Sequence, residues 1–121
     1  MISTALQNTI VAIIPNTYLA MGDEGIVTPY CVHKETATPE YLKSGIAGYS
    51  YVCEIAIIDL LPEALETLIQ SVKNAILALA GTTLNGTSFE SVIWETEAPD
   101  FDTQSKLYTN ILTFTILTSN R

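Results

Sequence analysis

The residues of this chain that could perform nucleophilic chemistry are two cysteines and a single histidine. Cys31 and His33 lie two positions apart, and Cys53 follows in a later apolar segment. A cysteine nucleophile needs a histidine base beside it and a carboxylate that orients the histidine, and Glu35 and Glu54 are available for that role. However, alternate residues of any strand share one face. The spacing of Cys31, His33 and Glu35 therefore predicts an ordinary strand surface, and we expect no enzymatic activity.

The two cysteines also lack the spacing of a redox or metal motif. No CxxC pair is present, and zinc prefers three or four Cys or His ligands where this chain has three such residues in all. We expect Cys31 and Cys53 to be buried thiols. If their two strands pair antiparallel, the cysteines could be near neighbours, and a disulfide is the less favoured alternative.

Four carboxylates gather near the C-terminus, at Glu95, Glu97, Asp100 and Asp102. A divalent cation could bind such a segment, but the ligand spacing and the glycine of an EF-hand are missing. A solvated acidic turn at residues 99–105 is the favoured interpretation. No glycine-rich phosphate loop follows a predicted strand, so we expect no catalytic residue, metal or cofactor.

Composition describes an apolar and acidic protein. The chain has 121 residues, 48% hydrophobic and 15% charged, with 13 acidic and 5 basic side chains and a net charge of −8. Its mean hydropathy is +0.31. These values exclude a disordered chain, which would be polar and rich in charge. They also argue against a surface that grips nucleic acid, because such affinity comes largely from Lys and Arg. Some of the apolar surface is expected to be covered by other chains, although a tightly packed monomer is an open alternative.

Targeting features are not expected either. The N-terminal segment lacks a basic flank, and Gln7, Asn8 and Thr9 interrupt its apolar positions, so it does not resemble a signal peptide. No run approaches the about 18 apolar residues of a membrane span.

Hydrophobic periodicity predicts seven elements in the order α-β-β-α-β-β-β. We expect a helix at 3–14, a strand at 28–37, a strand at 49–58, a helix at 62–80, a short extended run at 82–84, and strands at 89–96 and 107–118. Residues 16–26 are expected to form a loop, and 38–48 a long, mobile hairpin loop. The pair Asn85-Gly86 predicts a hairpin turn, which is preferred to a glycosylation signal at Asn85-Gly86-Thr87.

Two of these segments define the expected core. The helix at 62–80 begins with Pro62 and carries one apolar stripe, and Gly81 follows it as a natural terminator. The strand at 49–58 is apolar on both faces, which places it near the centre of a sheet. We therefore predict one α+β domain over residues 1–121, with a mixed or mostly antiparallel sheet of four to five strands. One face of that sheet would carry the long helix, accompanied by a short N-terminal helix.

The order of motifs along the chain resembles a known family. TPYCVHKE, YVCEIAIID and PEALETLIQSVKNAILAL are followed by NGTSFESVIWETE, APDFDTQSKLY and TNILTFTIL. This succession, which covers residues 3–118, is similar to the tail-completion, or tail-terminator, proteins of long-tailed bacteriophages and prophages. The positions that match features of the family are Pro29-Tyr30, Asp59, Glu63-Ala64-Leu65 and Asp100-Phe101.

The resemblance implies a structural role rather than an activity. Proteins of this family form a ring, commonly of six subunits, on the head-proximal end of the tail tube, where they stop polymerisation and offer a docking face to neck proteins. It implies a virion protein of the head–tail junction, assembled in the host cytoplasm, whose partners are its own copies, the tail tube protein and a neck or head-completion protein. DNA would pass through the ring without specific binding, and an acidic wall suits that passage because like charges repel phosphates.

Two segments are the expected places of partner or channel contact, since loops of this composition cannot serve a core. The residues concerned are Thr38, Glu40, Lys43, Ser44, Gly45, Glu95, Glu97, Asp100 and Asp102. Two alternatives are open. One is a neck or head-completion protein, and the other, of a different class, is a regulatory α+β domain that binds a small ligand or a metal.

Overall fold

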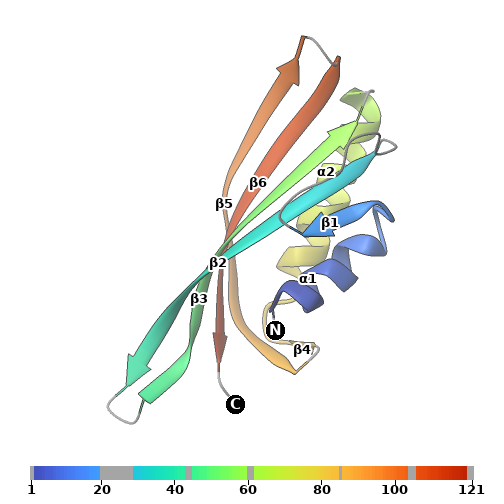
Figure 1. Ribbon diagram of the computed structural model, residues 1–121. Helices are drawn as coiled ribbons and strands as arrows, with labels where there is room; N and C mark the ends of the chain where they lie inside the picture. Colours follow the sequence, from blue (N-terminus) through green and yellow to red (C-terminus); the bar gives the residue numbers. More distant parts are fainter. Residues whose placement is uncertain are drawn as a thin grey trace.

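A computed structural model describes residues 2–19, 29–42, 45–59, 62–84, 86–103 and 106–119. Within these ranges two helices lie on one side of a six-stranded sheet (Figure 1). The elements in chain order are α1 (Ile2–Val11), β1 (Thr17–Leu19), β2 (Tyr30–Leu42), β3 (Gly45–Asp59), α2 (Pro62–Leu77), β4 (Thr83–Leu84), β5 (Thr87–Asp102) and β6 (Leu107–Ser119).

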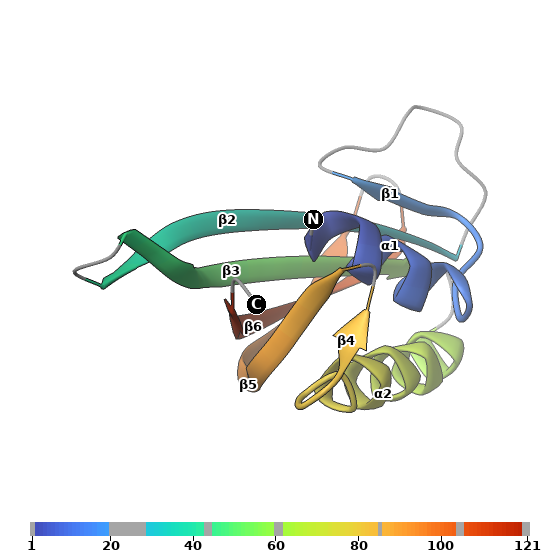
Figure 2. The same cartoon turned by 90° about the horizontal axis from the view of Figure 1, so that it is seen from below.

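The sheet is mixed, with the strand order β1-β2-β3-β6-β5-β4. β1 runs parallel to β2, and the other described neighbours are antiparallel. We call the face that carries α1 and α2 the inner face and the opposite one the outer face. Figure 2 shows the helices together on the inner side, and Figure 1 shows the β2–β3 and β5–β6 hairpins extending beyond them as two long arms.

The predicted α+β class and mixed sheet are confirmed, but the count of four to five strands is wrong because the described residues already form six. The order is α-β-β-β-α-β-β-β rather than α-β-β-α-β-β-β. The added strand is β1, which lies inside the predicted loop at 16–26. Three residues are too few to carry a periodic pattern. β1 exists because Thr17 to Leu19 pair with Cys31 to His33, and the sequence around residues 17–19 contains no pattern that predicts this pairing.

The long mobile loop predicted at 38–48 is also wrong. β2 continues to Leu42 and β3 starts at Gly45, and pairing runs along the arm through Thr38↔Ser50 and Pro39↔Tyr49. Pro39 is tolerated because β2 has a strand neighbour on one side only at this point of the described sheet. Gly48 is required because a Cβ there would collide with the carbonyl oxygen of Thr118. Proline and glycine mark special strand positions here rather than a loop.

The predicted acidic turn at 99–105 begins too early for a similar reason. β5 extends to Asp102 instead of ending near Thr96, because β6 pairs with it as far as Leu107. Glu90 and Glu95 lack a partner in β6 and sit at two β-bulges. Bulges bend a strand without ending it, so the acidic residues remain part of the sheet.

α2 begins at Pro62 as predicted but ends at Leu77 rather than at residue 80. From Leu79 the backbone follows the tighter 3₁₀ pattern, in which an amide donates to the residue three positions earlier. Leu79 N donates to Ile76 O at 3.1 Å, and Ala80 N donates to Leu77 O at 3.4 Å. Gly81 then adopts a φ of +80°, the left-handed conformation expected after a helix. The two-residue hairpin turn is confirmed, since Leu84 pairs with Thr87.

The core lies between the inner face and the two helices. β3, β6 and the stripe of α2 supply most of it, and β3 takes the predicted central position. Along β6, buried and partly exposed residues follow one another, so one face of the strand belongs to the core. The buried core residues are Ile2, Ala5, Leu6, Ile10, Ile14, Cys31, Cys53, Ile55, Ile57, Leu65, Ile69, Val72, Ile76, Leu79, Phe89, Leu112, Phe114 and Ile116.

Candidate functional site

The histidine candidate lies in a closed polar cluster beneath α1. His33 is 1% exposed. Its Nδ1 is 2.5 Å from Glu35 Oε1, and its Nε2 is 2.6 Å from Gln7 Oε1 on α1. Gln7 Nε2 donates to the carbonyl oxygen of Thr17 at 2.8 Å, and Ser3 Oγ donates to Glu35 Oε2 at 3.2 Å. The expected strand surface is therefore a covered one, and the cluster holds α1 against β1 and β2.

The cysteines do not join the histidine in a nucleophilic site, since both ring nitrogens of His33 are engaged by oxygens. Burial raises the pKa of each thiol, Cys31 and Cys53, to about 12, and the nearby Glu35 carboxylate adds to the rise. Such thiols stay protonated at neutral pH, whereas a nucleophile must be a thiolate.

The cysteines are buried and free, as expected, but they are not near neighbours. Cys31 pairs with Ile57 and Cys53 with Glu35, which offsets the two cysteines by four positions along the strands. That offset is about 13 Å at about 3.3 Å per residue. A disulfide needs Cα atoms within about 7 Å, so the geometry excludes one.

The residues predicted for partner contact fall into two groups on different strands. Thr38 and Glu40 are exposed on β2 and Gly45 is exposed at the start of β3, while Lys43 and Ser44 lie outside the described residues. The second group is on β5, which β3 and β6 separate from β2. The structure therefore does not bring the two groups together. The members on β5 are Glu95, Glu97, Asp100 and Asp102, of which the first three are exposed.

The outer face carries apolar side chains that no described element covers. Val52 on β3 is 45% exposed and Ile93 on β5 is 50% exposed. Both pair with Thr115 of β6, so the three side chains form one row across the sheet. Leu117, also exposed, lies two positions further along β6. The face is suited to contact with another surface.

The backbone edges of the central strands β2-β3-β6-β5 are open as well. In the described part of the sheet, β2 beyond His33 pairs only with β3, and β5 beyond Ser88 pairs only with β6. Unpaired edges present N–H and C=O groups on which another chain can add a strand. The bulges at Glu90 and Glu95 interrupt the β5 edge, and the stretch from Thr96 onward is regular.

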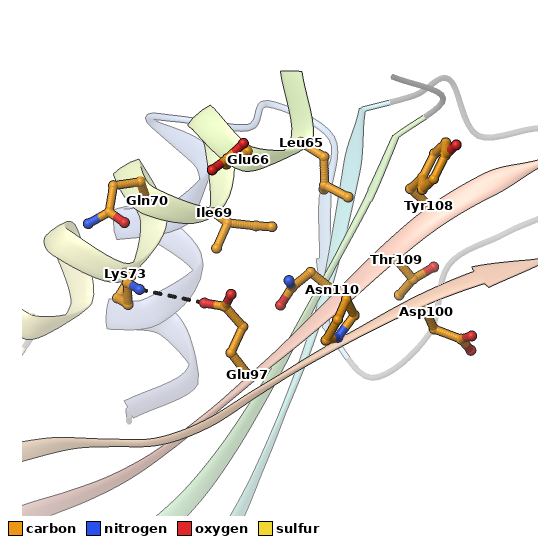
Figure 3. A pocket seen from close by; sticks show the side chains of 11 residues that line it. Leu65, Glu66, Ile69, Gln70, Lys73, Glu97, Asp100, Tyr108, Thr109 and Asn110 are labelled. Atoms are coloured by element: carbon orange, nitrogen blue, oxygen red, sulfur yellow. Dashed lines mark ion pairs between the residues drawn. The ribbon is translucent and has the colours of Figure 1, made fainter. Parts of the chain in front are cut away.

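A pocket of about 320 Å³ lies between α2 and the ends of β5 and β6 (Figure 3). We call it the α2 cleft. Lys73 closes one end: its Nζ is 3.5 Å from Glu97 Oε1 and 4.0 Å from the centre of the Trp94 ring. The lining residues are Leu65, Glu66, Ile69, Gln70, Lys73, Glu97, Pro99, Asp100, Tyr108, Thr109 and Asn110.

Asn110 is the unusual member of this cleft. It is 5% exposed, and its Oδ1 has no hydrogen-bond partner in the described part of the chain. Figure 3 shows its side chain directed toward α2, between Ile69 and Glu97. The sequence held a signal for it, because Asn110 interrupts the apolar inner-face series Tyr108, Leu112, Phe114 and Ile116 of β6.

Two classes of site are not found in the ranges that the structure describes. No group of three or more His, Cys, Asp or Glu side chains there could hold a metal ion. Neither described helix has the length and apolar character to cross a membrane.

Comparison with solved structures identifies the fold. No family model matches the chain, and no curated protein matches its sequence. A chain of the virion of a native gene transfer agent particle is similar to it in structure, with a TM-score of 0.77 and 13% sequence identity. The similarity covers 97% of this chain and 93% of the other. The protein therefore has the fold of that virion component over nearly its whole length.

Proposed function

We propose that this protein is a structural component of a phage-like virion and that it acts as the tail terminator. It assembles as a ring, commonly of six copies, on the head-proximal end of the tail tube. The ring ends polymerisation of the tube protein and presents a docking face to a neck or head-completion protein. The protein works at the head–tail junction after assembly in the host cytoplasm, and it catalyses no reaction.

The observation that carries this proposal is the match to the gene transfer agent virion chain, which extends over 97% of the protein. Fold alone does not assign a function. The order of sequence motifs, which resembles tail-terminator proteins over the same length, supports the finer assignment. The first line uses the backbone and the second uses the order of the residues.

The open strand edges support assembly into a ring. Neighbouring strands alternate in direction across β2-β3-β6-β5, so β2 and β5 run in opposite directions. A rotation that carries one copy to the next along the sheet preserves strand direction. β5 of one copy would then meet β2 of the next copy antiparallel, and repeated head-to-tail contacts of this kind close into a ring when the rotation divides a full turn.

The charge of the protein supports a place beside DNA. A net charge of −8 gives a surface that repels phosphates and does not hold them. The exposed carboxylates Glu95 and Asp100 of β5 would contribute to such a wall.

Electron microscopy of purified protein incubated with tail tubes tests the proposal. We expect extra density, with the rotational symmetry of the tube, at one end of each tube and none along its length. Ile93→Lys introduces a charge on the outer face and leaves the core of the protein intact. If the ring uses this face, fewer tube ends should carry a ring of the variant. Tubes that keep bare ends, with the protein remaining a monomer, would contradict the proposal.

Particles assembled without the protein separate the terminator from the neck-protein alternative. Overlong or headless tails support a terminator, whereas filled heads that leak DNA support a neck protein. A regulatory domain that binds a small ligand would leave the particles unaffected, and a rise in thermal stability with a metabolite or divalent cation would favour it.

A further inference from the structure

We propose that the α2 cleft holds an arginine side chain supplied by a partner protein. Its guanidinium donates a hydrogen bond to Asn110 Oδ1 and is balanced by the surrounding carboxylates. This inference does not rest on the tail-terminator proposal, because the cleft belongs to the single chain and can be tested on it alone.

The first reason is the missing donor at Asn110. A buried polar oxygen without a hydrogen bond is costly, and such groups are rare in folded proteins. Three buried side-chain oxygens lack a partner among the described residues, those of Ser91, Asn110 and Ser119, and only Asn110 lines the cleft. Its Oδ1 can only accept, so the group that completes it must carry an N–H or O–H.

The second reason is the charge of the lining. Two carboxylates, on Glu66 and Glu97, line the cleft together with one ammonium, on Lys73, which leaves a net charge of −1, because the side chain of Asp100 points to the other face of the sheet (Figure 3). An anion would be repelled from this cleft, and a neutral donor would leave the charge unbalanced. A cation meets both requirements at once.

The cleft already contains an example of how it accommodates a cation. The Lys73 ammonium lies against the Trp94 ring on one side and the Glu97 carboxylate on the other, and only 15% of the Lys73 side chain is exposed. The end of the cleft around Asn110 offers comparable surroundings, with apolar side chains of Leu65, Ile69 and Tyr108 for a stem. In the described part of the chain, no cation occupies that end.

Arginine fits this end better than lysine. A guanidinium is planar and carries five N–H donors, so it can serve an amide oxygen and a carboxylate together and lie flat on an aromatic ring. Tyr108 supplies such a ring, paired with Phe101 at 4.5 Å between centroids.

The occupant must come from another molecule. The chain has a single arginine, Arg121, two residues beyond the end of β6. Asn110 lies nine residues before that end, which is about 30 Å of strand. Ser119, the last described residue, is therefore about 30 Å from the cleft, which is further than two extended residues and an arginine side chain span.

Nuclear magnetic resonance of the full chain tests the site with N-acetyl-arginine amide as the probe. We expect saturable shifts of the Asn110 side-chain amide and the Ile69 methyl signals. N-acetyl-citrulline amide, which has the same shape without the charge, should bind at least about tenfold more weakly, the factor for losing one charged hydrogen bond. N-acetyl-lysine amide should also bind more weakly. Equal binding of the lysine or the citrulline compound, or no saturable shift, would overturn the proposal.

Variants assign the binding to individual groups. Asn110→Leu removes the acceptor and Glu66→Gln a charge, and each should weaken arginine binding about tenfold, read at the Ile69 methyl signals. Glu63→Gln changes an exposed carboxylate on the first turn of α2 outside the cleft, and it should leave binding unchanged. If the Asn110 amide of the unliganded protein shifts with protein concentration and Arg121→Gln abolishes the shift, the occupant is a second copy and the assignment to a different partner is overturned.

Discussion

The inner face of the sheet carries two clusters of polar side chains, one beneath α1 and one beneath α2, and they differ in how their hydrogen bonds are satisfied. Beneath α1, each nitrogen of His33 meets an oxygen, and Glu35 and Gln7 have partners of their own. Beneath α2, Lys73 is held by Glu97 and Trp94, but Asn110 Oδ1 has no partner in the described chain.

The difference separates polar residues that serve the fold from polar residues that remain available to a partner. The cluster under α1 joins elements that are distant in sequence, and removing His33 leaves one oxygen of Glu35 and one oxygen of Gln7 without their hydrogen bonds to it. In the α2 cleft, Asn110 Oδ1 forms no hydrogen bond to another described element, so Asn110 adds little to the stability of the fold. A complete network indicates a structural role, and an incomplete one beside a cleft indicates binding.

The largest expected effect comes from breaking the closed cluster. His33→Ala removes the partner of Glu35, whose side chain is 2% exposed, and leaves a buried carboxylate without its imidazole. We expect a loss of about 3–5 kcal/mol in the free energy of unfolding, measured by urea titration. Lys34→Ala, on the neighbouring exposed position, is the control and should change stability by no more than about 0.5 kcal/mol. A small effect of His33→Ala would show that the cluster is not closed.

The opposite sign is expected in the cleft. Asn110→Leu replaces an unsatisfied amide with an apolar side chain of similar size beside Leu65 and Ile69, and it should raise the free energy of unfolding by about 1–2 kcal/mol. Thermal and urea unfolding measure the change. Asn110→Ala serves as a control that also removes the amide but leaves a void, and it should not stabilise. If Asn110→Leu destabilises the protein strongly, Asn110 serves the fold and the comparison fails.

The thiols near the closed cluster report on it through pH. Each thiol has its pKa raised from 9.0 to about 12, so between these values the folded chain binds more protons than the unfolded one. Stability must therefore fall as pH rises from about 9 toward 12, by about 1 kcal/mol per thiol at pH 10. Urea titrations at pH 8 and pH 10 check the sign. The double variant Cys31→Ala, Cys53→Ala should lose that part of the dependence, and an identical pH slope in it would count against burial of the thiols.

The smallest effect is expected at the ion pair that closes the cleft. Lys73→Met keeps an apolar stem over Trp94 but removes the ammonium that pairs with the Glu97 carboxylate. The free energy of unfolding should fall by about 0.5–1 kcal/mol, because the pair is partly exposed to solvent. Fluorescence of Trp94, the single tryptophan, follows unfolding and the change of its environment. A loss well above 1 kcal/mol would indicate that this end of the cleft is as closed as the cluster under α1.

How far the sequence predicts the fold depends on whether a signal is local. The helix start at Pro62, the turn at Gly86, the central place of β3 and the alternation of β6 follow from caps, turns and periodicity. β1 does not, since it exists only through its pairing with β2. The sequence places the ends of β2 and β5 too early. Pro39 and the acidic residues of β5 indicate loops when read from the sequence, but they are tolerated in a strand that has a neighbour on one side only.

The candidate sites were less predictable for the same reason. His33 and Glu35 could be paired from the sequence, but Gln7 and Ser3 come from a helix whose packing no motif encodes. Asn110 left a trace as a polar residue in an apolar series. Its significance appears only when Lys73 and Glu66 are brought opposite to it by α2.

The length distribution of tails tests the proposed role in the virion most directly. Tail tubes are assembled from purified tube protein with and without this chain, with Ile93→Lys and Lys34→Ala as the matched outer-face variant and control, and the tubes are measured by electron microscopy. The account predicts that the native chain and Lys34→Ala halt growth and leave one capped end, and that Ile93→Lys lets tubes grow on if the ring uses the outer face. Tubes of equal length in every mixture would contradict it.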